Sequence, residues 1–172
     1  MVLPDEVLDI VDENDNVIGQ KNRSEIYRER LSNFRVVNVF LVNSKGQLWI
    51  PRRSDSKRIF PSCLDVSMGG HVESGESYED ALVRELHEEL NLSVNLSACT
   101  VLGYLLPHTD NVSAFMKVYE IKMDETPLYN RDDFSESFWL MPDDVLTKIA
   151  EGDRCKDDLP KLVERFYIQG HN

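Results

Sequence analysis

Residues 70–92 read GHVESGESYEDALVRELHEELNL. Leucine recurs every four residues in this stretch, at Leu82, Leu86 and Leu90. That spacing predicts an amphipathic helix with one apolar face. Ser77, with Asp80 three residues later, resembles the capping box at which such helices begin. We therefore expect a helix over residues 77–90.

Three glutamates, Glu85, Glu88 and Glu89, lie beside the leucine face of this helix. At 100° per residue they fall within an arc of roughly 100°. Like charges at this spacing destabilise an isolated helix, so a cation is expected to offset them. Mg²⁺ takes oxygen ligands from carboxylates, water and phosphates. The cluster therefore predicts a Mg²⁺ site, with Mn²⁺ as the alternative ion, although a bare acidic string is more often a solvated helix face.

The whole stretch resembles the box of the Nudix hydrolase superfamily: Gly, five residues, Glu, seven residues, Arg-Glu-aliphatic, one residue, Glu-Glu, one residue, Gly, aliphatic. Residues 70–92 match eight of its nine defined positions. The departure is Asn91 in place of Gly, where a left-handed backbone is usual and Asn is tolerated. The resemblance implies an α/β Nudix fold: an α/β/α sandwich with a central mixed β-sheet and an N-terminal β-hairpin extension, in one domain over residues 1–172.

The resemblance also assigns roles to individual residues. The metal ligands that it implies are Glu85, Glu88, Glu89 and the backbone carbonyl of Gly69. Glu85 is the expected base that deprotonates the attacking water. Arg84 completes the expected catalytic set by holding a glutamate through a charge-assisted hydrogen bond, and Glu76 is expected to anchor the corner between loop and helix. Gly69 is also compatible with a simple turn glycine.

Substrate contacts are expected outside the box. The dense basic stretch of this acidic chain comprises Arg52, Arg53, Lys57 and Arg58. Arg52 and Arg53 are expected to hold substrate phosphates, because arginine binds phosphate through paired hydrogen bonds; a solvated loop is the alternative. Glu136, and with less support Asp133, precedes a predicted strand where related proteins often place another metal-binding acid. Exposed loop acids are the alternative for both.

The motifs LDIVDENDNVIG at residues 8–19 and IPRRS at 50–54 resemble the isopentenyl-diphosphate-isomerase-like subgroup of the superfamily. True isomerases carry a catalytic Cys directly before the Gly-His of the box, where this chain has Gly69, and Cys63 is not assumed to replace it. The resemblance therefore implies metal-dependent hydrolysis of a diphosphate linkage. Nucleoside di- or triphosphates are the first expected substrates and ADP-ribose-type dinucleotides the second. Isomerase activity and a non-catalytic nucleotide-binding module remain the alternatives.

Chain-wide properties limit the class of protein. A length of 172 residues suits one hydrophobic core. The net charge of −12 disfavours nucleic-acid and anionic membrane partners, which leaves a small phosphorylated molecule as the expected partner. Three widely spaced cysteines suit reduced thiols, and the N-terminus has no secretory signal pattern, so we expect a cytoplasmic protein. A monomer and a homodimer are both open.

Strands interleaved with helices are expected in the rest of the chain. Turn-forming residues at 13–16 predict one hairpin at residues 7–19. β-Branched and aromatic residues predict a second, more buried hairpin at 35–51. Pro51 is expected at a strand end or an edge. Further strands are expected at 100–106, 112–123 and 137–141, and helices at 21–30, 142–152 and 156–167.

Overall fold

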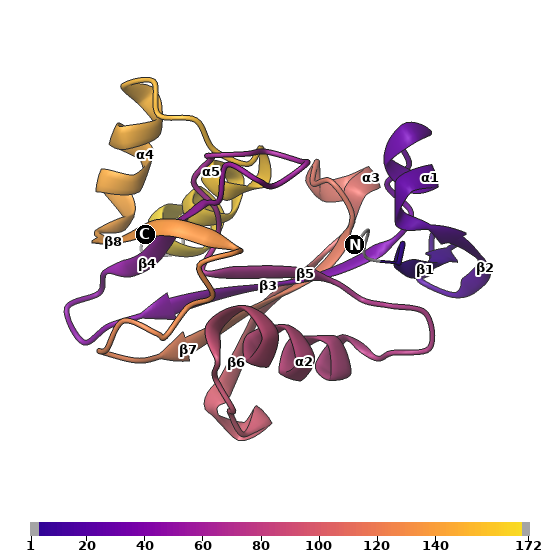
Figure 1. Ribbon diagram of the computed structural model, residues 1–172, viewed down its shortest axis with the longest axis horizontal. Helices are drawn as coiled ribbons and strands as arrows, with labels where there is room; N and C mark the ends of the chain where they lie inside the picture. The colour runs from indigo at the N-terminus through magenta and orange to yellow at the C-terminus, as the bar shows by residue number, and fades with distance from the viewer. Residues whose placement is uncertain (1–3, 170–172) are drawn as a thin grey trace.

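The computed structural model describes residues 4–169, and a mixed β-sheet runs through its centre (Figure 1). The strands of this sheet are β3 (Arg35–Val42), β4 (Leu48–Arg53), β5 (Met68–His71), β6 (Cys99–Leu105), β7 (Phe115–Lys122) and β8 (Phe134–Leu140). Their order is β6-β7-β3-β4-β8, with β5 beside β3. Strands β3 and β7 are parallel and the other neighbours are antiparallel.

Helices cover both faces of the sheet. Helix α2 (Tyr78–Leu90) packs on one face, and α4 (Pro142–Ala150) and α5 (Asp158–Val163) pack on the other (Figure 1). Shorter helical turns are α1 (Arg23–Arg28), η1 (Leu96–Ala98), α3 (Pro107–Asp110) and the π-helical continuation of α5, η2 (Glu164–Ile168). The expected α/β/α sandwich is confirmed. No helix within residues 4–169 combines the length and apolar character needed to cross a membrane.

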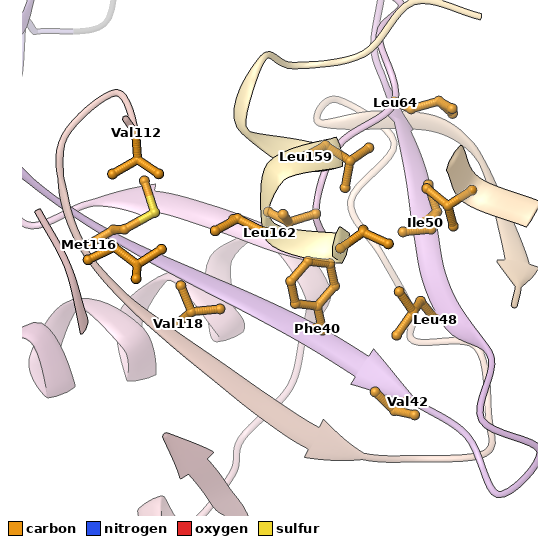
Figure 2. Close-up of a cluster of buried hydrophobic side chains, with 14 residues drawn as sticks. Phe40, Val42, Leu48, Ile50, Leu64, Val112, Met116, Val118, Leu159 and Leu162 are labelled. Carbon is orange, nitrogen blue, oxygen red and sulfur yellow. The ribbon is translucent and has the colours of Figure 1, made fainter. Parts of the chain in front are cut away.

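Strand β3 separates two hydrophobic cores. Its alternating side chains Val37, Val39 and Leu41 join the cluster that includes the apolar face of α2. Phe40 and Val42 point to the other cluster, where Figure 2 shows Phe40 beside Leu162 of α5. Successive strand residues point to opposite faces, so a strand buried on both sides is apolar throughout.

A small unit at the start of the chain packs beside the main sheet. It consists of β1 (Val7–Val11), β2 (Val17–Asn22) and α1 (Arg23–Arg28), seen in indigo and violet in Figure 1. The two strands form the expected antiparallel hairpin. Leu8, Ile10 and Ile26 of this unit form a separate hydrophobic cluster with Phe34 and Ala114 of the main domain.

The structure departs from the sequence expectations at several places, among them β8, which begins at Phe134 rather than at residue 137, and the helical turns η1 and α3, which were not expected. Strand β5 was not expected, because Met68-Gly-Gly-His lacks the residues that favour strands. The strand expected from residue 112 begins at Phe115, and the helix expected over 156–167 is divided between α5 and η2. Pro51 lies inside β4 rather than at its end. At this position β4 pairs with β8 but not with β3, which it meets only at Leu48, so the alternative expectation of an edge holds locally.

Candidate active site

Helix α2 begins and ends where the sequence predicts. The Ser77 hydroxyl accepts from the Asp80 N–H at 3.0 Å, and the Asp80 carboxylate accepts from the Ser77 N–H at 3.0 Å. At the other end Asn91 has a φ of 52° and a ψ of 33°. The Asn91 N–H donates to the His87 carbonyl at 3.1 Å, the bond that defines the left-handed helix cap. Asn91 therefore adopts the left-handed backbone expected of the family glycine.

Arg84 links the loop before α2 to the helix itself. Its Nε and Nη2 donate to the two carboxylate oxygens of Glu76, at 2.7 and 2.9 Å, and Nη2 also donates to the His71 carbonyl at 3.0 Å. Glu76 in turn accepts from the Glu73 N–H at 2.9 Å. Paired hydrogen bonds of this kind fix geometry as well as adding energy. Glu76 and Arg84 thus hold the corner between loop and helix.

Glu85 is held between that arginine and the backbone of β5. It is 8% exposed, and its Oε1 accepts from Arg84 Nη1 at 2.8 Å. A Cβ added to Gly70 would lie 2.3 Å from Glu85 Cγ, so only glycine leaves room for this side chain. Burial raises the pKa of Glu85 to about 7, against the lowering effect of Arg84. A carboxylate titrating near neutrality is suited to proton transfer.

Glu89 lies one helical turn further along the same face. Its Oε2 is buried and has no hydrogen-bond partner among the described residues. Burial raises the pKa of Glu89 well above its usual range, and the nearby Glu85, Asp133 and Asp65 carboxylates raise it further. An ionised carboxylate in such a place requires a positive partner. Glu89 is therefore the side chain in α2 whose surroundings most clearly suit a cation.

Glu88 differs from the other two glutamates. Its side chain is 57% exposed, and it contacts Arg84 at 3.4 Å. The expectation that all three carboxylates face one place is met by Glu85 and Glu89, while Glu88 lies at the solvent side of α2. Among residues 4–169 no three His, Cys, Asp or Glu side chains are gathered closely enough to form a ready-made metal site.

The residues of α2 nevertheless fit a hard divalent cation. The donors are carboxylate oxygens, which Mg²⁺ prefers, and one of them is the unpartnered buried Oε2 of Glu89. Mg²⁺ commonly keeps several waters and takes only one or two carboxylates, so a closed cluster of protein ligands is not required. Gly69 lies inside β5, paired with Asn38, so the turn interpretation of this glycine is wrong. Its carbonyl as a ligand stays a prediction.

Arg52 is engaged in an ion network on the β8 side of β4. Its Nε donates to Glu136, and Nη1 and Nη2 donate to Asp153 at 2.8 and 2.9 Å. Nη1 also donates to the Ser62 carbonyl at 3.2 Å. Glu136 is the cross-strand neighbour of Arg52, and its side chain is 52% exposed. Contacts of Arg52 and Glu136 with a ligand stay predictions, and for Arg52 they require these bonds to be exchanged.

The other basic side chains lie around the loop that follows β4. Arg53 Nη1 donates to the buried Asp65 at 3.1 Å, and its Nε and Nη2 donate to the Ile59 carbonyl. Lys57 pairs with Asp133, and Arg58 is exposed. The positive charge of Lys57 lowers the pKa of Glu89, so this loop lies near the acidic face of α2.

Sequence reasoning missed Asp65 and Lys156. Asp65 is 3% exposed, and its Oδ2 lies 3.1 Å from Arg53 and 3.9 Å from Lys156. Two cations therefore share one buried carboxylate beside the α2 glutamates. Both residues lie in irregular segments, where neither periodicity nor a motif marks them. The basic stretch that includes Arg53 was the one sequence feature that indicated charged side chains beside the α2 glutamates.

Comparisons with known proteins show which family this chain resembles. The family model described as the NUDIX domain matches residues 32–158. An uncharacterized Nudix hydrolase of Nostoc sp. is 65% identical over 162 residues, 94% of this chain and 96% of the relative. A crystal structure of a Deinococcus radiodurans protein superimposes with a TM-score of 0.87 at 49% identity, covering 94% of this chain and 99% of the other.

More distant relatives include enzymes of another reaction class. Isopentenyl-diphosphate Delta-isomerase 2 of Photorhabdus laumondii is 28% identical over 138 residues, 79% of this chain and 77% of the relative. This likeness agrees with the subgroup that residues 8–19 and 50–54 indicate. Cys63, the nearest upstream cysteine, is buried in the loop after β4.

Proposed function

This chain belongs to the Nudix family, and on that premise we propose that it hydrolyses a diphosphate linkage. The proposed substrate is a nucleoside di- or triphosphate or a related nucleoside diphosphate derivative. The proposed cofactor is Mg²⁺. The observation that carries the proposal is a pair of glutamates on α2, the buried Glu85 and the half-buried Glu89. Glu85 is fixed by Arg84 and Gly70, and Glu89 has a buried oxygen with no partner among residues 4–169. Such an arrangement is costly unless it serves a cation.

Three glutamates and one carbonyl would hold the ion: Glu85, Glu88, Glu89 and Gly69. A bound divalent cation supplies charge neutralisation of the phosphates and Lewis acidity. Glu85 takes the proton of the attacking water, because it is the buried carboxylate of this face of α2 and its position is fixed by Arg84 and Gly70. Arg84 keeps the Glu85 carboxylate oriented through the 2.8 Å hydrogen bond between them. Positioning of this kind accounts for a large share of catalysis in phosphoryl chemistry.

The cations beside α2 suit a substrate rich in phosphate. Arg58 is exposed, Lys57 is partly exposed, and Lys156 lies 3.9 Å from Asp65, longer than a hydrogen bond. An incoming polyphosphate has the negative charge to compete for these side chains. In a chain of net charge −12, this local concentration of cations favours an anionic ligand at this site over the rest of the surface.

A substrate screen tests the proposal directly. Nucleoside di- and triphosphates, nucleotide sugars, dinucleotides and isopentenyl diphosphate are incubated with Mg²⁺ or with a chelator, and the products are separated by chromatography. We expect Mg²⁺-dependent release of phosphate, pyrophosphate or a nucleoside monophosphate, and its loss in chelator.

The substitution Glu89→Gln is the sharper step of this test. It keeps the size of the side chain and removes the charge, so turnover should fall by about 100-fold or more. Glu125→Gln is the matched control, because Glu125 is exposed in the loop after β7. Isomerisation of isopentenyl diphosphate without hydrolysis, or full activity of Glu89→Gln, would overturn the proposal.

A further inference from the structure

The N-terminal unit, residues 4–28, precedes the part of the chain that the family model matches. It nevertheless contacts the box loop, which we define as residues 71–77 between the end of β5 and helix α2. In Figure 1 this loop extends from β5 towards the side of the molecule that carries the N-terminal unit. Three sets of polar contacts join the unit to this part of the chain. One is at Ser74 and Gly75, one is at His71, and one is at Tyr78.

The first contact is made by Asp9 in β1. It is 7% exposed, and no cation lies within salt-bridge distance of it among the described residues. Its Oδ1 accepts from the Ser74 hydroxyl at 2.8 Å, and its Oδ2 accepts from the Gly75 N–H at 3.2 Å. The Ser74 N–H also donates to the Val7 carbonyl at 2.8 Å. A buried carboxylate of the N-terminal unit is thus satisfied mainly by the box loop.

The second contact lies at the start of the box loop, and the third lies just beyond its end, at the first residue of α2. The His71 ring lies between the Tyr27 hydroxyl, 2.8 Å from Nε2, and the Glu6 carboxylate, 3.4 Å from Nδ1. Asp15, in the turn between β1 and β2, accepts from the Tyr78 hydroxyl at 2.8 Å. The N-terminal unit therefore holds the chain from His71 to Tyr78 at its start, its middle and its end.

The same loop carries the residues that orient the α2 glutamates. The His71 carbonyl and the Glu76 carboxylate accept from Arg84, and Arg84 donates to Glu85. A displacement of the loop would therefore move Arg84 and, through it, Glu85. A shift of about 1 Å in a catalytic group is enough to reduce a rate by about 100-fold.

We propose that Asp9 is a positioning residue for the metal-binding glutamates, acting through the box loop, Glu76 and Arg84. This inference rests on the proposed function, since it assigns the N-terminal unit a task in that reaction. Asp9 touches neither substrate nor metal. Its two oxygens fix the backbone of the loop, and the loop fixes the acceptors of Arg84.

The substitution Asp9→Asn tests this role. An amide has a single acceptor oxygen, which the Gly75 N–H takes, so the Ser74 hydroxyl faces an NH₂ group and must turn from donating to accepting. The negative charge that both loop donors now meet is lost as well. Mn²⁺ serves as the probe, its binding measured by electron paramagnetic resonance with no substrate present. We expect about 10-fold weaker Mn²⁺ binding and a kcat lowered by about 10-fold, the usual size of such supporting contacts. The KM for the best nucleotide should change by less than about 2-fold.

Asp12→Asn is the matched control. Asp12 belongs to the same hairpin and accepts from the N–H groups of Asn14 and Asn16, within the hairpin turn. It should leave Mn²⁺ binding and kcat near the wild-type values. If Asp9→Asn does not fold, Ser74→Ala removes one donor to Asp9 from the loop side, and we expect a change of about 3-fold in the same direction.

The outcomes separate this inference from the proposed function. A wild-type chain that neither binds Mn²⁺ nor hydrolyses any compound of the screen overturns the proposed function. An active wild type with Asp9→Asn unchanged in Mn²⁺ binding overturns only the positioning role. Equal losses in Asp9→Asn and Asp12→Asn also overturn it, because they would show a general need for the hairpin rather than a specific contact.

Discussion

Gly70 shows at the scale of one residue how a missing side chain determines the place of another. The Glu85 carboxylate occupies the space where a Cβ on residue 70 would lie, 2.7 Å from Oε1. The glycine of the box therefore admits the buried glutamate that follows fifteen positions later. Its function is steric, since its φ is not among the positive values in the chain.

Replacing Gly70 by Ala should move Glu85 out of place. We expect kcat to fall by about 100-fold, because the new methyl group collides with the glutamate rather than with a flexible surface chain. Steady-state kinetics on the best substrate measures the effect. Gly19→Ala is the control, since no atom lies within 4 Å of its added Cβ. Equal activity of the two variants would contradict this account of Gly70.

Asn91 sets the end of helix α2, and its effect belongs to the scale of the element. Its φ of 52° strains any residue with a Cβ, while its side-chain amide donates to the Leu128 carbonyl. Asn91→Ala should therefore lower the free energy of unfolding by about 1–2 kcal/mol, measured by urea denaturation. Asn91→Gly keeps the backbone conformation and loses only the side-chain bond, so its loss should be smaller. The reverse order would show that the left-handed cap is unimportant.

The elements themselves could be predicted where the sequence is periodic. The leucine repeat predicted α2, and Ser77 with Asp80 predicted its start, both as observed. Strand β5 could not be predicted, because its pairing with β3 depends on backbone contacts and its two glycines carry no strand preference. The periodicity of apolar residues indicates which face of an element is buried. It gives no information about a strand whose pairing is made by backbone atoms alone.

The candidate site could be predicted only along α2. Arg84 with Glu76 is placed as the box motif suggested, whereas Glu88 proved more exposed than its position on the helical wheel implied. The wheel gives a direction around the helix axis, but the depth of each side chain depends on what packs beside it. Asp65 and Lys156 escaped prediction because tertiary packing alone brings them to the site.

At the scale of the whole molecule, Arg52 joins segments that are far apart in the chain. Asp153, beyond α4, and Glu136 on β8 both receive its hydrogen bonds. Hydrogen bonds from Arg52 lower the pKa of Asp153 to about 2, from an ordinary value of 3.8. The folded state therefore favours the ionised carboxylate, and this contribution to stability is present above pH 3.8. It is lost as the pH falls through about 2.

Asp153→Asn should remove that contribution. At pH 7 we expect the free energy of unfolding to fall by about 1 kcal/mol, because Arg52 loses a charged partner. The difference from wild type should shrink between about pH 4 and pH 2, where Asp153 itself becomes protonated. Thermal unfolding followed by circular dichroism across this range measures both effects. Asp132→Asn, at an exposed loop position, is the control, and a gap that stays constant with pH would contradict the assignment.

The alternation of side chains along β3 has a practical consequence for protein engineering. Val37, Val39 and Leu41 support the layer that contains α2, while Phe40 and Val42 support the opposite layer. A designer who wants a more heat-resistant variant with unaltered turnover has reason to redesign the even-numbered side first. Libraries that vary Val37, Val39 and Leu41 would instead change the packing beneath α2. Selection from these libraries should yield variants with altered catalysis rather than higher stability.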